Sequence, residues 1–182
     1  MKLSELHSHI KSLGFEKVYE DENFVNDAIT RALMEINSSV KAIVGRYDFT
    51  AEQYESYDLP ELTERFDQVD RIVERTTEGT KTFTDYEIEQ GRILVMNKSG
   101  NFTVFYKERV MPVTGDTDIE SNVQCEYTVE PLVHLLTAYY VWLDDDVTKS
   151  AMYYNQYDQL KKEILNEQAR PKARIVGGFK WQ

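Results

Sequence analysis

Residues 130–164 read EPLVHLLTAYYVWLDDDVTKSAMYYNQYDQLKKEI, and this stretch decides the fold that the sequence predicts. Three aspartates at 144–146 divide it into two segments of helical period. A short link between two long helices makes them antiparallel neighbours, so we expect a helical hairpin over residues 128–170. The first segment repeats apolar residues at helical spacing, which gives one wide stripe: Leu132, Leu135, Leu136, Tyr139, Trp142 and Leu143.

The ends and the inner face of this hairpin are predicted in the same way. Thr128 is a good N-cap for the first helix, and Pro131 is tolerated in the first turn. Asp146 is expected to cap the second helix, which stops before Pro171. The side chains of the second helix that we expect to point inward are Val147, Ala151, Tyr154, Leu160 and Ile164.

Two more helices are predicted at the start of the chain. The first is short, with Gly14 at the place of a C-terminal cap, and its helical spacing comes from Leu3, Leu6, Ile10 and Leu13. The second begins at about Asn23 and ends at Gly45. Its apolar stripe is expected to pack on the hairpin, so that residues 1–46 and 128–170 form an antiparallel bundle of about four helices. The stripe consists of Ile29, Ala32, Leu33, Ile36, Val40 and Ile43.

Between the helical regions the period becomes that of strands. Runs of β-branched and aromatic residues at 69–76, 81–88, 92–97 and 102–108 alternate with turn signals at 89–91 and 98–101. Such a pattern favours hairpins, so residues 66–127 are predicted to form an inserted antiparallel β-unit. A last strand is expected at 122–127. The polar, aromatic stretch at 47–66, with turn signals around 58–60, is interpreted as a loop.

The predicted fold class is therefore α+β: one domain with an antiparallel helical bundle, an inserted β-unit and an extended C-terminal arm. A length of 182 residues suits one domain with an insertion. No apolar run reaches the length that spans a bilayer. The single cysteine, Cys125, fits a reducing compartment. The net charge of −11 argues against wrapping nucleic acid, because phosphate binding needs a basic surface.

The last twelve residues, PKARIVGGFKWQ at 171–182, differ from the rest of the chain. Residues 168–182 hold four of the 21 Lys and Arg residues and none of the 32 Asp and Glu residues. Because this segment has no helical period, it cannot bury its own Phe and Trp, and exposing them without a use is unfavourable. We therefore expect a docking arm, with these partner-binding residues: Arg170, Lys172, Arg174, Ile175, Val176, Phe179, Lys180 and Trp181.

Catalytic, cofactor-binding and metal residues are not expected. The glycines form neither a phosphate-binding loop nor a nucleophile elbow, so no cofactor is predicted and the chain is not expected to be an enzyme. The aspartates at 144–146 are a candidate for a hard cation. However, the Gly and Glu spacing of a calcium loop is absent, so we favour the interpretation that they cap a helix.

The remaining reactive side chains are also interpreted as structural. His7 and His9 point to different sides of a helix, and His134 is expected to face solvent or a partner. Cys125 is predicted to lie in a strand with acids nearby, which raises the pKa of a thiol. A buried, inert cysteine is therefore favoured over a thiol–imidazole pair with His134.

Twelve tyrosines are a second unusual feature of the composition. Those at 47, 54 and 57 cluster in the predicted loop, and such rings serve either a carbohydrate-binding platform or a protein interface. Others crowd the helical hairpin. Tyr139 and Tyr154 are expected in the core, whereas a contact between subunits is expected for Tyr140, Tyr153 and Tyr157.

Residues 130–164 resemble the C-terminal helical hairpin of the neck adaptors, the head–tail connector proteins of tailed bacteriophages. In that family an apolar helix ends in an aliphatic–aromatic stretch and an Asp-Asp turn, and a Tyr-rich helix follows. NDAITRALMEINSSV at 26–40 is similar to the family's long second helix. FDQVDRIVER at 66–75, RILVM at 92–96 and FTVFYKERVMPVT at 102–114 are similar to its β-unit. The resemblance is a loose pattern over most of the chain, and the β-unit is longer than in the smallest members.

The resemblance implies a virion structural protein of the neck, assembled in the host cytoplasm. It implies a homo-oligomeric ring, dodecameric by that likeness, which lies under the portal protein and receives the stopper or tail proteins. The arm would dock on the portal, and packaged DNA would pass an acidic channel without specific binding. No membrane partner is expected. The alternatives are another neck or tail-completion protein or, in a different class, a glycan- or receptor-binding module that uses the Tyr-rich loop.

Overall fold

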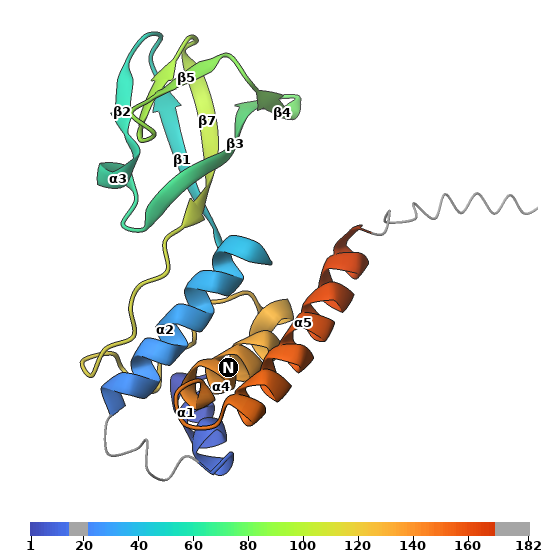
Figure 1. Ribbon diagram of the computed structural model, residues 1–182. Helices are drawn as coiled ribbons and strands as arrows, with labels where there is room; N and C mark the ends of the chain where they lie inside the picture. Colours follow the sequence, from blue (N-terminus) through green and yellow to red (C-terminus); the bar gives the residue numbers. More distant parts are fainter. Residues whose placement is uncertain (15–21, 170–182) are drawn as a thin grey trace, which may run out of the picture.

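The computed structural model describes residues 1–14 and 22–169. In these ranges five α-helices and seven strands form two regions, with most of the helices at one end and all the strands at the other (Figure 1). The helices are α1 (Leu3–Ser12), α2 (Glu22–Ser39), α3 (Leu59–Leu62), α4 (Glu130–Trp142) and α5 (Val147–Ala169). The strands are β1 (Val44–Ala51), β2 (Ser56–Asp58), β3 (Phe66–Thr76), β4 (Gly79–Phe83), β5 (Tyr86–Glu89), β6 (Ile93–Met96) and β7 (Gly100–Glu108).

The helical unit consists of α1, α2, α4, α5 and the segment 109–126. Helix α4 is its centre: it packs against α1, α2 and α5, and it is buried on most sides. A helix that is apolar nearly all round belongs inside a core, and α4 has this composition. The predicted stripe of α2 is confirmed at four positions, where Ile29, Ala32, Leu33 and Ile36 are buried in the same cluster.

The sheet unit, residues 44–108, contains two antiparallel sheets. One has the strand order β1-β7-β3-β4 and the other β2-β6-β5. Side chains from both sheets and from α3 form a second buried cluster, separate from that of the helices: Ala51, Leu59, Phe66, Ile72, Phe83, Leu94, Met96, Phe102, Val104 and Tyr106.

Two turns of this unit lie close to their predicted places. Gln90 and Gly91 have φ angles of 51° and 72°, as a tight β5–β6 hairpin turn requires. The second turn, at residues 97–99, joins β6 to β7. The expected strand at 102–107 is confirmed, because β7 extends from Gly100 to Glu108.

The predicted fold class, a helical bundle with a small β-insertion, is wrong. The strands begin at Val44, and seven of them build two sheets with their own core. The expected loop at 47–66 contributes β1, β2 and α3. The expected strand at 122–127 is absent, since that segment makes an isolated bridge from Asn122 to Lys2 and then a 3-10 turn at Tyr127–Val129. The predicted arm, 171–182, lies outside the described residues.

The physical reason for this error is visible in β1. Its inward positions alternate strictly, but they are occupied by Gly45, Tyr47, Phe49 and Ala51, of which the two rings stay half-exposed. Phe49 is the one large, wholly apolar residue among these four, so the alternating signal of the strand is weak. Charged outward residues beside it then make the sequence resemble a loop.

The junction between the two units also changes a helix boundary. Helix α2 ends at Ser39 and not at Gly45. The side chain of Asn37 holds the chain there: its oxygen accepts a hydrogen bond from Ile43 N at 2.8 Å, and its nitrogen donates to Glu108 O at 3.0 Å. One amide therefore fastens the start of β1 and the end of β7 to α2.

Candidate interaction surface on the last helix

The start of α5 is fixed by the turn that the sequence singled out. Asp146 Oδ1 accepts hydrogen bonds from the backbone nitrogens of Thr148 and Lys149, both at 3.0 Å, so the predicted N-cap is confirmed. The hydroxyl of Ser150 donates to Tyr139 O at 3.1 Å and ties the first turn of α5 to α4. Helix α5 therefore lies along α4 as the second half of the expected hairpin (Figure 1).

The inner side of α5 is held by a carboxylate that the sequence analysis did not single out. Tyr157 is 1% exposed, and its hydroxyl donates to Glu35 Oε1 at 3.1 Å. Tyr140 on α4 donates to Glu35 Oε2 at 2.8 Å. Burial, with the nearby carboxylate, raises the pKa of both tyrosines, so they remain protonated donors. This node joins α2, α4 and α5.

The expectation that Tyr157 contacts another subunit is therefore wrong, because its ring belongs to the core. Tyr140 is half-buried and is committed to Glu35. The position of Glu35 in the sequence could have predicted this burial, because Glu35 lies on α2 between the apolar residues Leu33 and Ile36. A single acid beside a buried stripe needs a partner, and protonated phenols supply it without a second charge.

The outer side of α5 carries the residues expected to point inward. Val147 is 72% exposed and Ala151 is exposed as well, so that expectation is wrong for these two. Tyr154 is 42% exposed and lies at the edge of the hairpin, with its ring 5.0 Å from that of Tyr139 on α4. With Leu165, 37% exposed, they share one line along the helix, since residues 4, 7 and 18 apart return to the same side. We call Val147, Ala151, Tyr154 and Leu165 the outer stripe.

The surroundings of the outer stripe are poor in charge. Between residues 147 and 157 the one charged side chain is Lys149, and its ammonium lies 3.9 Å from the centre of the Trp142 ring. Leu143, at the end of α4, and Met152 add exposed apolar surface. Depletion of charge together with Tyr and Met is typical of the centre of a protein–protein interface. We therefore take this side of α5 as the candidate interaction surface.

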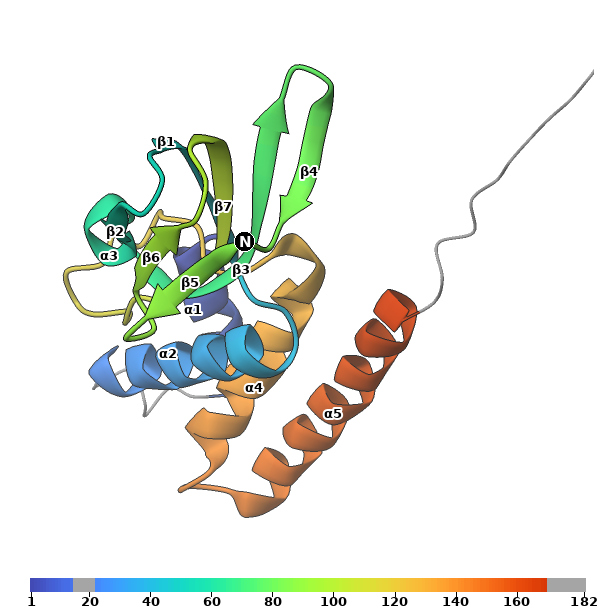
Figure 2. The same cartoon turned by 90° about the horizontal axis from the view of Figure 1, so that it is seen from above.

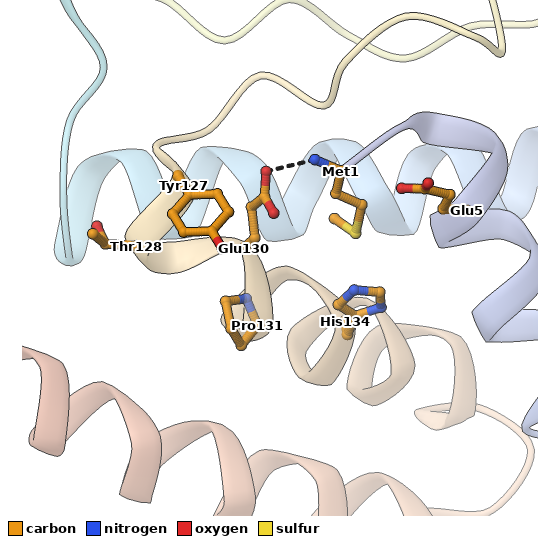
Figure 3. A pocket seen from close by; sticks show the side chains of 7 residues that line it. All are labelled: Met1, Glu5, Tyr127, Thr128, Glu130, Pro131 and His134. Atoms are coloured by element: carbon orange, nitrogen blue, oxygen red, sulfur yellow. Dashed lines mark hydrogen bonds and ion pairs between the residues drawn. The ribbon is translucent and has the colours of Figure 1, made fainter.

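A hollow of about 600 Å³ lies where α1 meets the start of α4 (Figure 3). The terminal ammonium of Met1 is 2.6 Å from Glu130 Oε1 within it, and Tyr127 is 84% exposed. Of the other polar groups in the hollow, Glu5 accepts a hydrogen bond from Lys2 N at 2.9 Å, and His134 Nδ1 is buried without a hydrogen-bond partner. The residues that line it are Met1, Glu5, Tyr127, Thr128, Glu130, Pro131 and His134.

The side chains near this hollow offer no activated nucleophile. His134 makes an edge contact with His9, with ring centres 4.5 Å apart, and burial lowers the pKa of His134. His134 is half-buried between α1 and α4 and lines the hollow, so it faces solvent only in part. Burial raises the pKa of Cys125 to about 11, so this thiol stays protonated at neutral pH. Cys125 therefore behaves as the inert side chain that the sequence indicates.

The described residues, 1–14 and 22–169, contain no group of three or more His, Cys, Asp or Glu side chains placed to hold a metal ion. In the same ranges no helix is long and apolar enough to cross a lipid bilayer.

The Tyr-rich segment presents one ring prominently. Tyr47 and Tyr57 are half-buried against Phe49, with ring centres 6.2 Å and 5.2 Å from it. The Tyr57 hydroxyl donates to Glu55 Oε2 at 2.9 Å. Tyr54 is 71% exposed and has a φ angle of 65°, at the tip between β1 and β2. A flat platform of three rings is therefore not formed.

The predicted partner-binding residues all lie outside the described residues, so the structure neither places them nor tests them: Arg170, Lys172, Arg174, Ile175, Val176, Phe179, Lys180 and Trp181. They follow directly after the end of α5 at Ala169.

A scan of the chain against models of known protein families finds no match. A search of curated proteins also finds no significant match.

Proposed function

We propose that this chain is a non-enzymatic virion structural protein, the adaptor of a head–tail connector. It forms a homo-oligomeric ring under the portal, docks on the portal by its C-terminal arm, and joins the head to the tail or the stopper. The observation that carries this proposal is the outer stripe of α5, which exposes Val147, Ala151, Tyr154 and Leu165 on the helix that precedes the basic, aromatic segment 170–182 in the sequence.

A helix with apolar residues on two sides needs two partners. The inner side of α5 packs on α4. Of the outer stripe, Tyr154 lies 5.0 Å from the Tyr139 ring of α4, while Val147, Ala151 and Leu165 stay exposed. Burying apolar area contributes about 25 cal/mol per Å², and the charge-poor part of α5, residues 147–157, is about 15 Å long. This geometry supports a protein whose folded state is completed by another protein chain.

The overall charge supports the same proposal. A ring of subunits with a net charge of −11 each surrounds DNA without binding it, because like charges repel. The basic segment 168–182 is the exception in the sequence, and it suits an acidic surface on the portal. In this proposal, the acidic body of the chain repels DNA, and the basic arm is attracted to an acidic protein surface.

The test compares the full chain with a chain that ends at Arg170, in co-sedimentation with purified portal rings at low and high salt. We expect the shortened chain to lose binding at both salt concentrations. The full chain should bind more weakly at high salt, because surface charge pairs are screened. A full-length variant with Phe179→Ala and Trp181→Ala separates the aromatic anchors from the charges. Equal binding by both chains at both salts would refute docking by the arm.

The two alternative functions predict different binding partners. Another neck or tail-completion protein would co-sediment with tail or stopper components and not with portal rings. A glycan- or receptor-binding module would depend on Tyr54, the prominently exposed ring of the Tyr-rich segment. Tyr54→Ala would then abolish glycan binding, while removal of residues 171–182 would leave it unchanged.

A further inference from the structure

We infer that the sheet unit is hinged on the helical unit, and that the side-chain amide of Asn37 sets the angle between them. The hinge consists of two neighbouring chain segments, residues 42–44 at the start of β1 and residues 108–110 at the end of β7. This inference does not depend on the proposed function, because it follows from how the two units are joined (Figure 1).

Each unit has a core of its own. The buried cluster of the helical unit takes its members from residues 3–36 and 110–157, and that of the sheet unit from residues 51–106. Among the described residues, 1–14 and 22–169, no buried side chain belongs to both clusters, and the elements that pack extensively do so within one unit. Relative motion is the default for two bodies that share no large apolar interface.

The sheet unit closes its core at the end where it joins the helices. Phe66 and Tyr106 lie there, beside the last pair of β3 with β7 and the first pairs of β1 with β7. Both rings are buried, and their centres are 6.0 Å apart. Arg65 Nε adds an ion pair to Glu108 Oε2 at 3.4 Å. A change in the angle between the units would therefore leave the sheet core covered.

The helical unit holds each hinge segment by one apolar side chain. Val110 is buried in the helical cluster, and Ile43 packs against the same cluster. Val44, the next residue after Ile43, is 47% exposed, so the chain leaves the helical core at once. A change of direction would fall on the few residues between these two side chains and the paired strands, as in other hinges formed at the ends of elements.

The Asn37 amide binds both hinge segments at the same time. The segments are joined to each other where Glu108 N donates to Ile43 O at 2.9 Å, which continues the pairing of β1 with β7. Asn37, in the last turn of α2, accepts from Ile43 N through its oxygen and donates to Glu108 O through its nitrogen. One rigid amide with a donor and an acceptor thus holds both strands at one angle to α2. Without it, the sheet unit would be held by the backbone of the two segments alone.

The experiment measures distances between pairs of spin labels by pulsed electron paramagnetic resonance, in the full chain with Cys125→Ser. One pair joins the units: Thr80→Cys on β4, in the hairpin that projects from the sheet unit in Figure 2, and Gln159→Cys on α5. Two control pairs lie within one unit, Thr80→Cys with Glu87→Cys and Ser8→Cys with Gln159→Cys. All four labelled positions are exposed. Dilution with unlabelled protein removes distances between copies.

We expect the distance distribution between the units to be about twice as wide as either control distribution, because it contains the hinge motion as well as the motion of the labels. Asn37→Ala should widen it by about half again and leave both control pairs unchanged. The matched control is Ser38→Ala on the same turn of α2, which should have no effect, because the Ser38 hydroxyl bonds to Glu35 O within the helix.

Three outcomes would overturn the inference. A distribution between the units as narrow as the controls would show one rigid body. An unchanged width in Asn37→Ala would show that the amide does not set the angle. Widening of the control pairs in Asn37→Ala would assign this side chain to the stability of a unit and not to a hinge. Co-sedimentation with portal rings tests the proposed function separately.

Discussion

The two units of this protein bury their cores in different ways. The sheet unit is continuous in sequence, from Val44 to Glu108, and its two sheets close around one apolar cluster. The helical unit is assembled from segments before and after the sheet unit, so that α4 reaches α2 only when the chain has returned. The sheet unit completes its core within one continuous segment, which includes the long-range pairing of β1 with β7, whereas the helical unit needs segments from both sides of that insertion.

This difference also decides which surface remains open. Strands of the sheet unit present one side to the shared cluster and charged residues to solvent, as β1 does with Arg46 and Asp48. In the helical unit the last helix covers α4 with one side and keeps an apolar stripe on another. The candidate interface therefore lies on α5, on a side that stays largely exposed among the described residues.

The largest expected effect concerns the helical core. Trp142→Ala should lower the free energy of unfolding by about 3–5 kcal/mol, because the ring is 5% exposed and its removal leaves a cavity. Denaturant unfolding monitored by circular dichroism measures it. Val147→Ala, at a side chain that is 72% exposed, is the control and should change stability by less than about 0.5 kcal/mol. A loss below about 1 kcal/mol for Trp142→Ala would place that ring outside the core.

The corresponding test of the sheet core is Phe102→Ala. Phe102 is fully buried and packs against Phe83, with ring centres 4.8 Å apart, so a loss of about 3–4 kcal/mol is expected. Hydrogen exchange should show amides of β3 and β7 losing more protection than those of α2. An equal loss of hydrogen-exchange protection in both units would mean that the two units unfold together and do not differ in stability.

Tyr157→Phe tests the node that attaches α5 to α2. It removes a buried hydroxyl that donates to the Glu35 carboxylate at 3.1 Å, so a loss of about 1.5–3 kcal/mol is expected. Tyr154→Phe, at an exposed ring, should be neutral. If the two variants are equally stable by denaturant unfolding, the node does not hold the hairpin.

Gly45→Ala tests the junction between the units. A Cβ at this position would lie 2.4 Å from the Tyr106 ring, and that ring is 9% exposed and has little room to move. Overpacking of this kind costs about 1–2 kcal/mol. The control is Gly115→Ala, where no heavy atom lies within 4 Å of the added carbon. If the thermal unfolding midpoints of Gly45→Ala and Gly115→Ala are equal, the Tyr106 ring moves aside without a cost in stability.

The smallest expected effect is a dependence on acidity in the sheet unit. Arg46 and Thr103 bind the Asp48 carboxylate and, with Arg75, lower its pKa from 3.8 to about 2. A lowered pKa stabilises the folded state above pH 4, and this contribution is lost as the pH falls from about 4 to about 2. Asp48→Asn should remove that part of the pH dependence. If the difference in the free energy of unfolding between the wild type and Asp48→Asn stays constant from pH 2 to pH 4, the Asp48 carboxylate does not contribute to the pH dependence.

The sequence predicted the elements whose signals are local. Helical spacing and the Asp146 cap located the hairpin of α4 and α5, and glycine at Gly91 located a turn of the sheet unit. The resemblance of residues 130–164 to neck adaptors remains a prediction about function. The candidate site was predicted in part, because the sequence pointed to the last helix and the segment beyond it, but assigned the two sides of that helix wrongly.

By itself, the sequence determined where periodicity, caps and turns occur, because these depend on neighbours within a few residues. Only the tertiary structure decided that Tyr157 is buried and Tyr154 exposed, since both lie on a helix with apolar residues on two sides. The side of α5 that faces Glu35 is fixed by α2, more than a hundred positions earlier in the chain. Likewise, β1 became a strand because β7 pairs with it along its whole length. Long-range pairing supplied what the weak alternation of Gly45, Tyr47 and Ala51 did not.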